Sequence, residues 1–245
     1  MAKVAVLIPA AGSSRRFKGQ KKKQFTDIDG RAVFLRTIEQ FAGRDDVIQV
    51  IMAIPAEDEE LFTIKWGASV GFHGVKVVLG GAERHETIEK MLALVKPEAE
   101  LIALHDAVRP CVTREMIDAV FAEAARSGAA ILAHKLVGTI KQADSAGRIV
   151  KTIDRSSLWE AQTPQVFRAE LLREAYRRKG EHKESLTDDA QLIEALGQPV
   201  ILVEADAGNI KITTNADIVI AEGILKSRPK PKGKGPGGPF AEAQW

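Results

Sequence analysis

The chain has 245 residues, of which 45% are hydrophobic and 28% charged, and its formal net charge is +2 at pH 7. This ordinary globular composition excludes an intrinsically disordered chain, and the near-neutral charge excludes a protein that binds polyanions with its whole surface. Nucleic-acid binding is disfavoured because aromatic residues make up only 5% and basic residues outside the first loop and the C-terminal segment are balanced by acids.

The cysteine content and the apolar runs indicate a compartment. The single cysteine, Cys111, excludes an intramolecular disulfide and suits a reducing environment. No apolar run approaches the ~18 residues of a membrane-spanning helix, and the start MAKVAVLIPAAG lacks the long apolar core of a signal peptide. We therefore expect a cytoplasmic protein with no membrane partner.

Short apolar runs alternate with helical patterns over the first half of the chain. Strands are predicted at VAVLIP, VIQVIMAI, VKVVL, LIALHD and AAILAHK. Between them, helices are predicted over residues 33–41 and 58–66, around residues 88–95 and from residue 113 to residue 128. Continuous apolar strands separated by helices predict an α/β fold, with a mostly parallel twisted sheet and helices on both faces.

Two of these helices carry specific signals. Ile88, Met91, Leu92 and Val95 recur at i, i+3, i+4 and i+7, which predicts one apolar face. In the next helix, Thr113 is the predicted N-cap, Gly128 the predicted C-cap, and the apolar stripe between them is Ile117, Val120, Phe121 and Ala124. Both helices are expected to cover the sheet.

The alternation breaks at residues 137–152, where two polar strands flank the turn-rich ADSAGR and predict a projecting β-arm. Helices over residues 169–179, 188–196 and 216–226 and the strand VILVEA return the chain to the domain. From residue 227 the chain is rich in Pro, Gly and Lys, which is typical of a flexible tail. We expect one domain over residues 1–226, with the arm, and a tail over residues 227–245.

The segment after the first predicted strand joins small residues to six cations between Arg15 and Lys23. It matches neither the P-loop nor the dinucleotide fingerprint, because Ser14 and Phe17 stand where those motifs need glycine. Ligands of α/β sheets nevertheless collect at the carboxyl ends of strands, where this loop begins.

The loop suits a triphosphate. Its small residues would let backbone N–H groups approach a ligand closely; they are Ala10, Ala11 and Gly12. The side chains that would supply charge are Arg15, Arg16, Lys18 and Lys23. We expect Lys21 and Lys22 to be solvated only. The alternative is a basic loop that faces water throughout.

Four later segments have both a functional and a structural interpretation. HDAVRP sets Asp106 and Arg109 three residues apart after a strand, as a site pair or a surface ion pair, whereas His105 is more typical of a packing histidine. TPQVF is compatible with a simple turn. LTDDA resembles a helix start with Thr187 as N-cap. In GNIKITT, an extended backbone would turn Lys211 away from its apolar neighbours, toward solvent or a cleft.

Seven segments, in order, carry a family resemblance: PAAGSSRRF…KKKQF, GGAERHETI, HDAVRP, TIDRSSLW, QTPQVF, LTDDA and NIKITTNADIVIAE. Together they resemble the 2-C-methyl-D-erythritol 4-phosphate cytidylyltransferases of the non-mevalonate isoprenoid pathway, over residues 4 to about 225. Two loop positions depart from the family pattern. Ser14 stands where the second glycine is usual, and Lys22 stands where a proline precedes the Lys-Gln pair.

The resemblance implies a Rossmann-like nucleotidyltransferase fold and the transfer of CMP from CTP to methylerythritol phosphate. The substrate phosphate would attack the α-phosphorus in line and release pyrophosphate. That phosphate has a second pKa of about 6, so it needs no general base at neutral pH. Catalysis would rest on positioning and charge. The resemblance also implies Mg²⁺ or another divalent cation, bound chiefly by triphosphate oxygens, and a homodimer joined through the β-arm.

Residue roles follow from the same resemblance. Arg16 and Lys23 would stabilise the transition state, and Lys211 would reach the α-phosphate from the opposite side. Asp106 would lie by the ribose and the metal, and Arg109 by the sugar phosphate. The cytidine would be held by Ala10, Ala11, Gly12, Gly81, Ala82 and Thr87. Methylerythritol phosphate would be bound by Thr139, Arg155, Thr163 and Thr187. Of these, Thr139 and Arg155 lie on the predicted arm and would complete the neighbouring subunit's site.

Two alternatives remain open. A ribitol 5-phosphate cytidylyltransferase would share the basic loop, HDAVRP and TPQ, and would differ in the acceptor. A nucleotide-binding regulatory protein that has lost catalysis would bind CTP without turnover. The retention of every cation that the family pattern expects counts against it.

Overall fold

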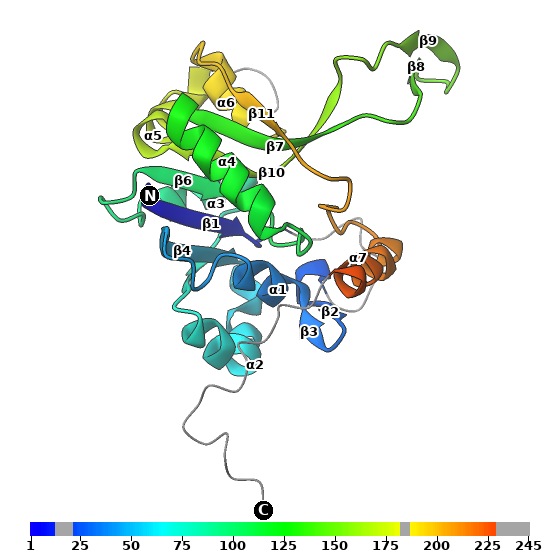
Figure 1. Cartoon of the computed structure of the whole chain (residues 1–245). Helices are drawn as coiled ribbons and strands as arrows, with labels where there is room; N and C mark the ends of the chain where they lie inside the picture. The colour runs from blue at the N-terminus through cyan, green and yellow to red at the C-terminus, as the bar shows by residue number, and fades with distance from the viewer. Residues whose placement is uncertain (13–21, 182–186, 229–245) are drawn as a thin grey trace, which may run out of the picture.

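The structure is a computed structural model that describes residues 1–12, 22–181 and 187–228. Its main sheet is built from β1 (Val4–Pro9), β4 (Val47–Ile54), β5 (Lys76–Leu79), β6 (Leu101–Leu104), β7 (Ala129–Lys135), β10 (Trp159–Arg168) and β11 (Ile201–Glu204). The strand order is β11-β7-β10-β6-β1-β4-β5 (Figure 1). Neighbouring strands are parallel except that β10 runs antiparallel to both β6 and β7, so the predicted mostly parallel sheet is confirmed.

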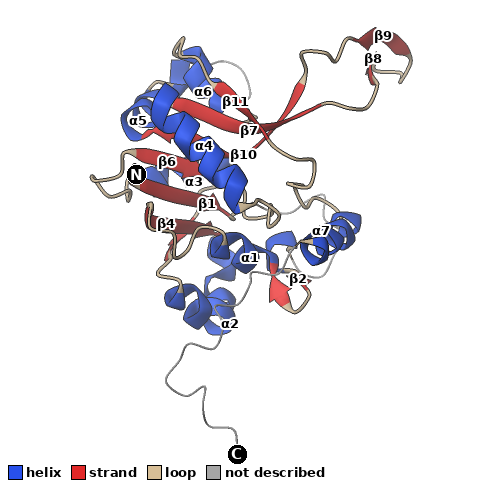
Figure 2. Cartoon of the chain, in the orientation of Figure 1, coloured by secondary structure: helices blue, strands red, loops and turns tan. Residues whose placement is uncertain are grey.

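Helices cover both faces of this sheet, as predicted (Figure 2). The described helices are α1 (Val33–Glu39), α2 (Glu59–Phe72), α3 (Arg84–Leu92), α4 (Arg114–Ser127), α5 (Ala169–Arg177), α6 (Ala190–Ala195) and α7 (Asn215–Ser227). Alternate residues of β1 point into two different cores. Val6 and Ile8 pack with side chains of α1, α2 and α4, whereas Leu7 packs with those of α3, α5 and α6. This two-sided burial is why β1 reads as a continuous apolar run.

The helix signals that the sequence carries are confirmed. Thr113 accepts a hydrogen bond from the Met116 N–H at 3.3 Å, and Gly128 ends α4 with a left-handed φ of 94°. The four residues of the α3 stripe are buried, although Val95 lies beyond the last helical residue. The second predicted helix extends further than its pattern indicated, since α2 continues to Phe72.

A cluster of aromatic rings holds the short helical turn η1 (Lys23–Phe25) against the domain. The rings come from η1, α1 and α2, and a second short turn, η2 (Ala56–Asp58), directly precedes α2. The Phe25 ring stacks on Trp66 with 5.1 Å between centroids and meets Phe34 edge-on at 5.9 Å. All three rings are buried, so the backbone on either side of Phe25 is held against the domain.

Two small antiparallel hairpins complete the fold: β2 (Asp27–Ile28) with β3 (Arg31–Ala32), and β8 (Ile140–Ala143) with β9 (Ile149–Ile153). The second hairpin is the predicted arm, and Figure 1 shows it projecting far from the sheet. Several apolar side chains of the arm are exposed: Val137 just before β8 (71%), Ile149 (64%) and Val150 (60%). A short turn, η3 (Lys179–Glu181), follows α5.

Three local predictions need correction. The central strand β10 was not predicted, and TPQVF is part of this strand rather than a turn. Thr187 is not a helix N-cap, because α6 begins at Ala190 and the Asp188 carboxylate accepts the Gln191 N–H at 3.3 Å. Lys211 lies in a loop that belongs to no strand. It is turned away from Ile212, as the sequence indicated, because Ile212 is buried while Lys211 is exposed.

Within the residues that the structure describes, no helix combines the length and the hydropathy that crossing a membrane requires. The expected tail falls largely outside the described residues, and α7 includes Ser227.

Candidate active site

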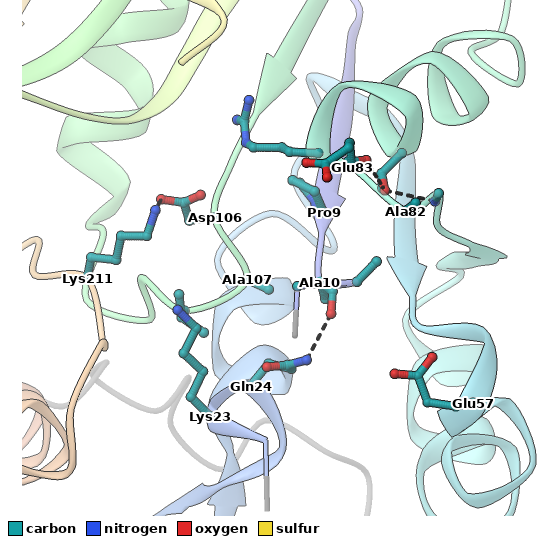
Figure 3. A pocket seen from close by; sticks show the side chains of 16 residues that line it. Pro9, Ala10, Lys23, Gln24, Glu57, Ala82, Glu83, Asp106, Ala107 and Lys211 are labelled. Carbon is teal, nitrogen blue, oxygen red and sulfur yellow. Dashed lines mark hydrogen bonds and ion pairs between the residues drawn. The ribbon is translucent and has the colours of Figure 1, made fainter. Parts of the chain in front are cut away.

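A cavity of about 610 Å³ opens at the carboxyl ends of β1 and β6. In the sheet, β1 lies between β4, the next strand along the chain, and β6, which the chain forms later. The chain therefore continues to opposite sides of β1, and the carboxyl ends of β1 and β6 mark the topological switch point of the sheet. Figure 3 shows lining side chains that come from separate segments, among them the end of β1, η1 and the loop of Lys211.

Nine of the site residues predicted from the sequence line this cavity: Ala10, Ala11, Gly12, Lys23, Gly81, Ala82, Thr87, Asp106 and Lys211. Seven further lining residues were not assigned a role from the sequence: Pro9, Gln24, Glu57, Glu83, Arg84, Ala107 and Val108. Arg16 lies outside the described residues, as do Arg15, Lys18 and Lys21.

One wall is formed where the turn after β1 meets the turn before α3. The Ala10 N–H donates to the Ala53 carbonyl at 2.8 Å, so the donors that this turn can offer a ligand are those of Ala11 and Gly12. Opposite, Gly81 donates its N–H to the Thr87 hydroxyl at 3.0 Å. That hydroxyl donates in turn to the Glu83 carbonyl at 3.1 Å. Thr87 thus fixes the path of the glycine turn, and among the described residues no donor meets the second lone pair of its hydroxyl.

A second wall holds the lysine that begins η1. Gln24 donates from Nε2 to the Ala10 carbonyl at 2.9 Å and is buried, which ties η1 to the end of β1. Lys23 directly precedes Gln24 in the chain, so this hydrogen bond positions the lysine where it lines the cavity (Figure 3). The sequence marked Lys23 as a site residue but gave no signal for the supporting role of Gln24.

Opposite charges meet at Asp106, directly after β6. Lys211 Nζ lies 2.9 Å from Asp106 Oδ2, and Arg109 Nε donates to the same oxygen at 3.3 Å. Burial opposes the ionisation of Asp106, but the charges of Lys211, Arg109 and Arg84 outweigh it and hold the pKa of this carboxyl below its usual range. Asp106 is therefore an ionised carboxylate at neutral pH.

A buried network behind Asp106 explains why HDAVRP and TPQ belong together. The Asp106 N–H donates to Thr163 Oγ1 at 3.0 Å, and Arg109 Nη1 donates to the Asn209 carbonyl at 2.7 Å. Asn209 Nδ2 donates to the Thr163 carbonyl at 3.0 Å, which links the loop of Lys211 to β10. Arg109 and Thr163 are buried and do not line the cavity, so they hold its wall from behind.

His105 is a packing residue, as its sequence context indicated. Its Nε2 lies 3.2 Å from the Arg109 carbonyl and its Nδ1 lies 3.1 Å from Thr163 Oγ1. Complete burial lowers the pKa of this imidazole to about 4, despite the opposing effect of Asp106. His105 is therefore neutral near pH 7.

The prediction that Lys22 is only solvated is wrong, because its side chain forms two ion pairs. Its Nζ lies 2.7 Å from Glu57 Oε1 and 2.6 Å from Asp58 Oδ2. Burial opposes protonation of Lys22, but the hydrogen bonds to Asp58 and Glu57 outweigh it and raise the pKa. The hydrogen bond from Lys22 lowers the pKa of Glu57, an acid that also lines the cavity.

Replacing Lys22 with alanine is expected to raise KM for a triphosphate ligand a few-fold, since exposed ion pairs contribute modestly. The physical reason is that Glu57 would then face a polyanion without its counter-ion. Adding Glu57→Gln should restore the original KM. Lys22→Pro should fold normally, because φ at this residue is −62° and suits proline. Initial rates at varied CTP check this, and an unchanged KM in Lys22→Ala would contradict it.

Besides Arg109 and Thr163, three predicted residues that the structure describes lie away from the cavity lining. Thr139 precedes β8 and Arg155 follows β9, and both are exposed at the arm. Thr187 is exposed just before α6, and its N–H donates to Gln191 Oε1 at 2.8 Å. The part of the chain that the structure describes therefore brings together the residues predicted to hold the nucleotide, but not those of the arm predicted to bind the acceptor.

Comparison with known proteins identifies the family. A sequence profile of the 2-C-methyl-D-erythritol 4-phosphate cytidylyltransferases matches residues 4–227. A relative of that name from Endomicrobium trichonymphae is 40% identical over 225 residues, which are 92% of this chain and 100% of the relative.

Solved structures agree with this match. The crystal structure of 2-C-methyl-D-erythritol 4-phosphate cytidylyltransferase from Thermus thermophilus has a TM-score of 0.75 and 34% identity, and the match covers 91% of this chain and 99% of that one. The crystal structure of 4-diphosphocytidyl-2C-methyl-D-erythritol synthase from Anaerococcus prevotii has a TM-score of 0.78 and 27% identity, over 92% and 99% of the two chains. The chain therefore belongs to the 2-C-methyl-D-erythritol 4-phosphate cytidylyltransferase family and is an enzyme with that family's activity.

Proposed function

We propose that the cavity at the ends of β1 and β6 is where CMP passes from CTP to methylerythritol phosphate. The observation that carries this proposal is that Lys23 and the Lys211–Asp106 ion pair line one cavity at the switch point of the sheet. Joining two polyanions requires cations that are fixed before the reaction begins. Lys23 is fixed through Gln24 and the ring of Phe25, and Lys211 through the buried Ile212 beside it.

In this proposal Lys23 and Arg16 stabilise the charge that develops on the triphosphate as the α-phosphorus is attacked. Lys211 approaches the α-phosphate from the loop that precedes α7. Its ion pair with Asp106 orients Nζ before the substrates arrive. No residue acts as a general base, since the attacking phosphate is already ionised. The neutral, fully bonded His105 is consistent with this absence.

The nucleotide would lie between the two small-residue turns. The N–H groups of Ala11 and Gly12 would contact phosphate or sugar oxygens. Gly81 and Ala82 would present backbone groups to the cytosine, and the remaining lone pair of Thr87 would accept from it. Ala10 would contribute close packing, since its N–H is already bonded within the sheet.

A divalent cation, Mg²⁺ in our proposal, fits the donors present. No group of three or more His, Cys, Asp or Glu side chains arranged for a metal occurs in residues 1–12, 22–181 or 187–228, which argues against a cage built by the protein alone. Asp106 is ionised, and both of its ion pairs within those residues use Oδ2, so Oδ1 is available as a single ligand. Mg²⁺ is commonly held by one or two carboxylates together with substrate phosphates, and when bound it would offset the triphosphate charge.

The acceptor side of the site would be completed by the arm of a second subunit. The exposed apolar residues of the hairpin support a dimer, because such side chains gain from being covered. Thr187 would contact methylerythritol phosphate within one subunit, while the buried Thr163 and Arg109 would support the wall beside it. Thr139 and Arg155 would reach it from the partner.

We also propose that the domain comprises residues 1–226 with its arm.

Replacing Arg155 with alanine is expected to raise KM for methylerythritol phosphate more than KM for CTP, because the guanidinium would bind the acceptor phosphate. Mixing this variant with Lys23→Ala tests the shared site. In a symmetric dimer each mixed pair would contain one intact site, so random exchange should restore about a quarter of the wild-type rate when methylerythritol phosphate is kept well below the raised KM of Arg155→Ala. Activity that stays at the level of the unmixed variants would contradict a site completed in trans.

The proposed reaction is tested by measuring pyrophosphate release with CTP and Mg²⁺, with methylerythritol phosphate and ribitol 5-phosphate as separate acceptors. Fast release with methylerythritol phosphate alone is the expected result. Release with ribitol phosphate alone would keep the phosphate chemistry and overturn the acceptor. No release with either, together with calorimetric binding of CTP, would favour a protein that binds the nucleotide without turnover.

A further inference from the structure

Arg84 is a basic residue of the cavity wall to which the proposed mechanism gives no role. It is the first residue of α3, directly after the turn expected to hold the cytosine. Its Nη2 donates to Asp189 Oδ2 at 2.5 Å, across 105 residues of chain. The Arg84 side chain remains 40% exposed, whereas the Asp189 side chain is only 1% exposed. The pair therefore reaches from the buried interior to the cavity.

Asp189 is itself held from two sides. Its Oδ1 accepts a hydrogen bond from the Tyr176 hydroxyl at 2.5 Å, so each carboxylate oxygen has one partner. Its backbone N–H donates to Gln165 Oε1 at 3.2 Å, which connects it to β10. Burial together with the charge of Asp189 raises the pKa of Tyr176, so this hydroxyl keeps the proton that it donates. The buried carboxylate is a rigid anchor for one end of the Arg84 fork.

The other end of that fork remains available. A guanidinium has five N–H donors in a planar arrangement that matches carboxylate or phosphate oxygens. Over the described ranges, the hydrogen bond to Asp189 is the one that Arg84 makes to another side chain. Asp189 does not line the cavity, and none of the carboxylates that do line it is ion-paired with Arg84 in the described chain. The hydrogen-bonded counter-ion of Arg84 thus lies behind the wall, and Asp106 inside the cavity acts on Arg84 only through space.

This arrangement differs from that of the other cation pair in the wall. Lys211 is paired with Asp106, which lines the same cavity, so a ligand there meets both signs of charge. Arg84 is paired with an acid that a ligand cannot reach. An anion in the cavity can therefore approach Arg84 without also approaching its counter-ion.

We propose that Arg84 is a further substrate-contacting residue, which binds a phosphate oxygen, and that Asp189 and Tyr176 are its positioning residues. The inference rests on the proposed function for the identity of that phosphate, which belongs either to CTP or to the acceptor. Inorganic pyrophosphate carries the same chemistry and is a probe that does not depend on turnover.

The test compares Arg84→Gln, Arg84→Lys, Asp189→Asn and Tyr176→Phe with Arg126→Gln, in which an exposed arginine paired with Glu123 on α4 is lost far from the cavity. Arg84→Gln is expected to raise one KM about tenfold or more, as the loss of a charge-assisted contact would. Arg84→Lys should fall between Arg84→Gln and wild type, since it keeps the charge and loses the fork. Asp189→Asn and Tyr176→Phe should raise the same KM by less.

Each outcome has one meaning. A raised KM for CTP alone assigns the nucleotide phosphates, and a raised KM for the acceptor alone assigns its phosphate. Unchanged KM values in a folded Arg84→Gln would overturn the inference, as would a fall in kcat that merely tracks a lower thermal midpoint. If Asp189→Asn fails to fold, the two Arg84 variants still decide. Should wild type release no pyrophosphate with either acceptor, the proposed function fails separately, and calorimetric binding of CTP and pyrophosphate to Arg84→Gln still tests the contact.

Discussion

Replacing Lys23 with alanine is expected to lower kcat by about 10²-fold or more, which is the scale seen when a fixed charge that stabilises a transition state is removed. Lys23 lines the cavity from η1, and η1 is held by Gln24 and Phe25, so the lysine is positioned before substrate arrives. KM for CTP should change much less than kcat, because the charge matters most as the α-phosphorus is attacked. Steady-state pyrophosphate release at varied CTP measures both constants.

Lys76→Ala is a suitable control, since it removes an exposed lysine at the start of β5, the opposite end of the strand from the cavity. It should leave kcat unchanged. Arg16→Ala carries the same expectation as Lys23→Ala, although this residue lies outside the described part of the chain. Near-wild-type turnover in both loop variants would mean that the cations face water, which is the alternative that the sequence left open.

Replacing Gly80 with alanine is expected to reduce kcat/KM for CTP by about 10²-fold, because errors of about an ångström in substrate position have effects of this size. A Cβ on Gly80 would lie 2.3 Å from the Ala11 Cβ and 3.0 Å from Thr87 Oγ1. The turn before α3 and the turn after β1 would have to separate, and both border the nucleotide cavity. Overpacking of this kind should also lower the free energy of unfolding by about 1–3 kcal/mol.

Gly71→Ala provides the matched control. A Cβ at Gly71, inside α2, has no atom within 4 Å, so this variant should keep wild-type kinetics and unfold no more easily. Thermal unfolding and CTP kinetics on the two variants separate packing from catalysis. If Gly80→Ala binds and turns over CTP normally, the two turns are not held together as tightly as their contact suggests.

The sequence predicted the helices and strands that are determined by residues close together in the chain. Strands such as β1 and β7 are buried on both faces and therefore appear as unbroken apolar runs. The caps of α4 are visible because Thr113 and Gly128 act on their own neighbours in the chain. The small residues Ala10, Ala11 and Gly12 line the cavity after β1, where adjacent small residues in the sequence had indicated a close-approach turn.

The sequence could not predict features that depend on distant partners. β10 carries the buried polar residues Gln162, Thr163 and Gln165, which are acceptable inside a sheet only because remote groups bond them. The position of Asp189 in LTDDA suggested a helix start, whereas its partner is Arg84, 105 residues away. Lys22 looked solvated because Glu57 and Asp58 lie 35 and 36 residues further along the chain.

The place of β10 in the sheet also governs the order in which the chain can assemble. The strands β6, β1, β4 and β5 are contiguous and are complete once Leu104 has been made. β7 comes next along the chain but cannot join them, because its neighbours in the sheet are β10 and β11. It must wait while the chain forms the β8–β9 hairpin and returns as β10. That returning strand brings the Thr163 hydroxyl to the Asp106 N–H. The strand that joins β7 to the rest of the sheet therefore also completes the cavity wall.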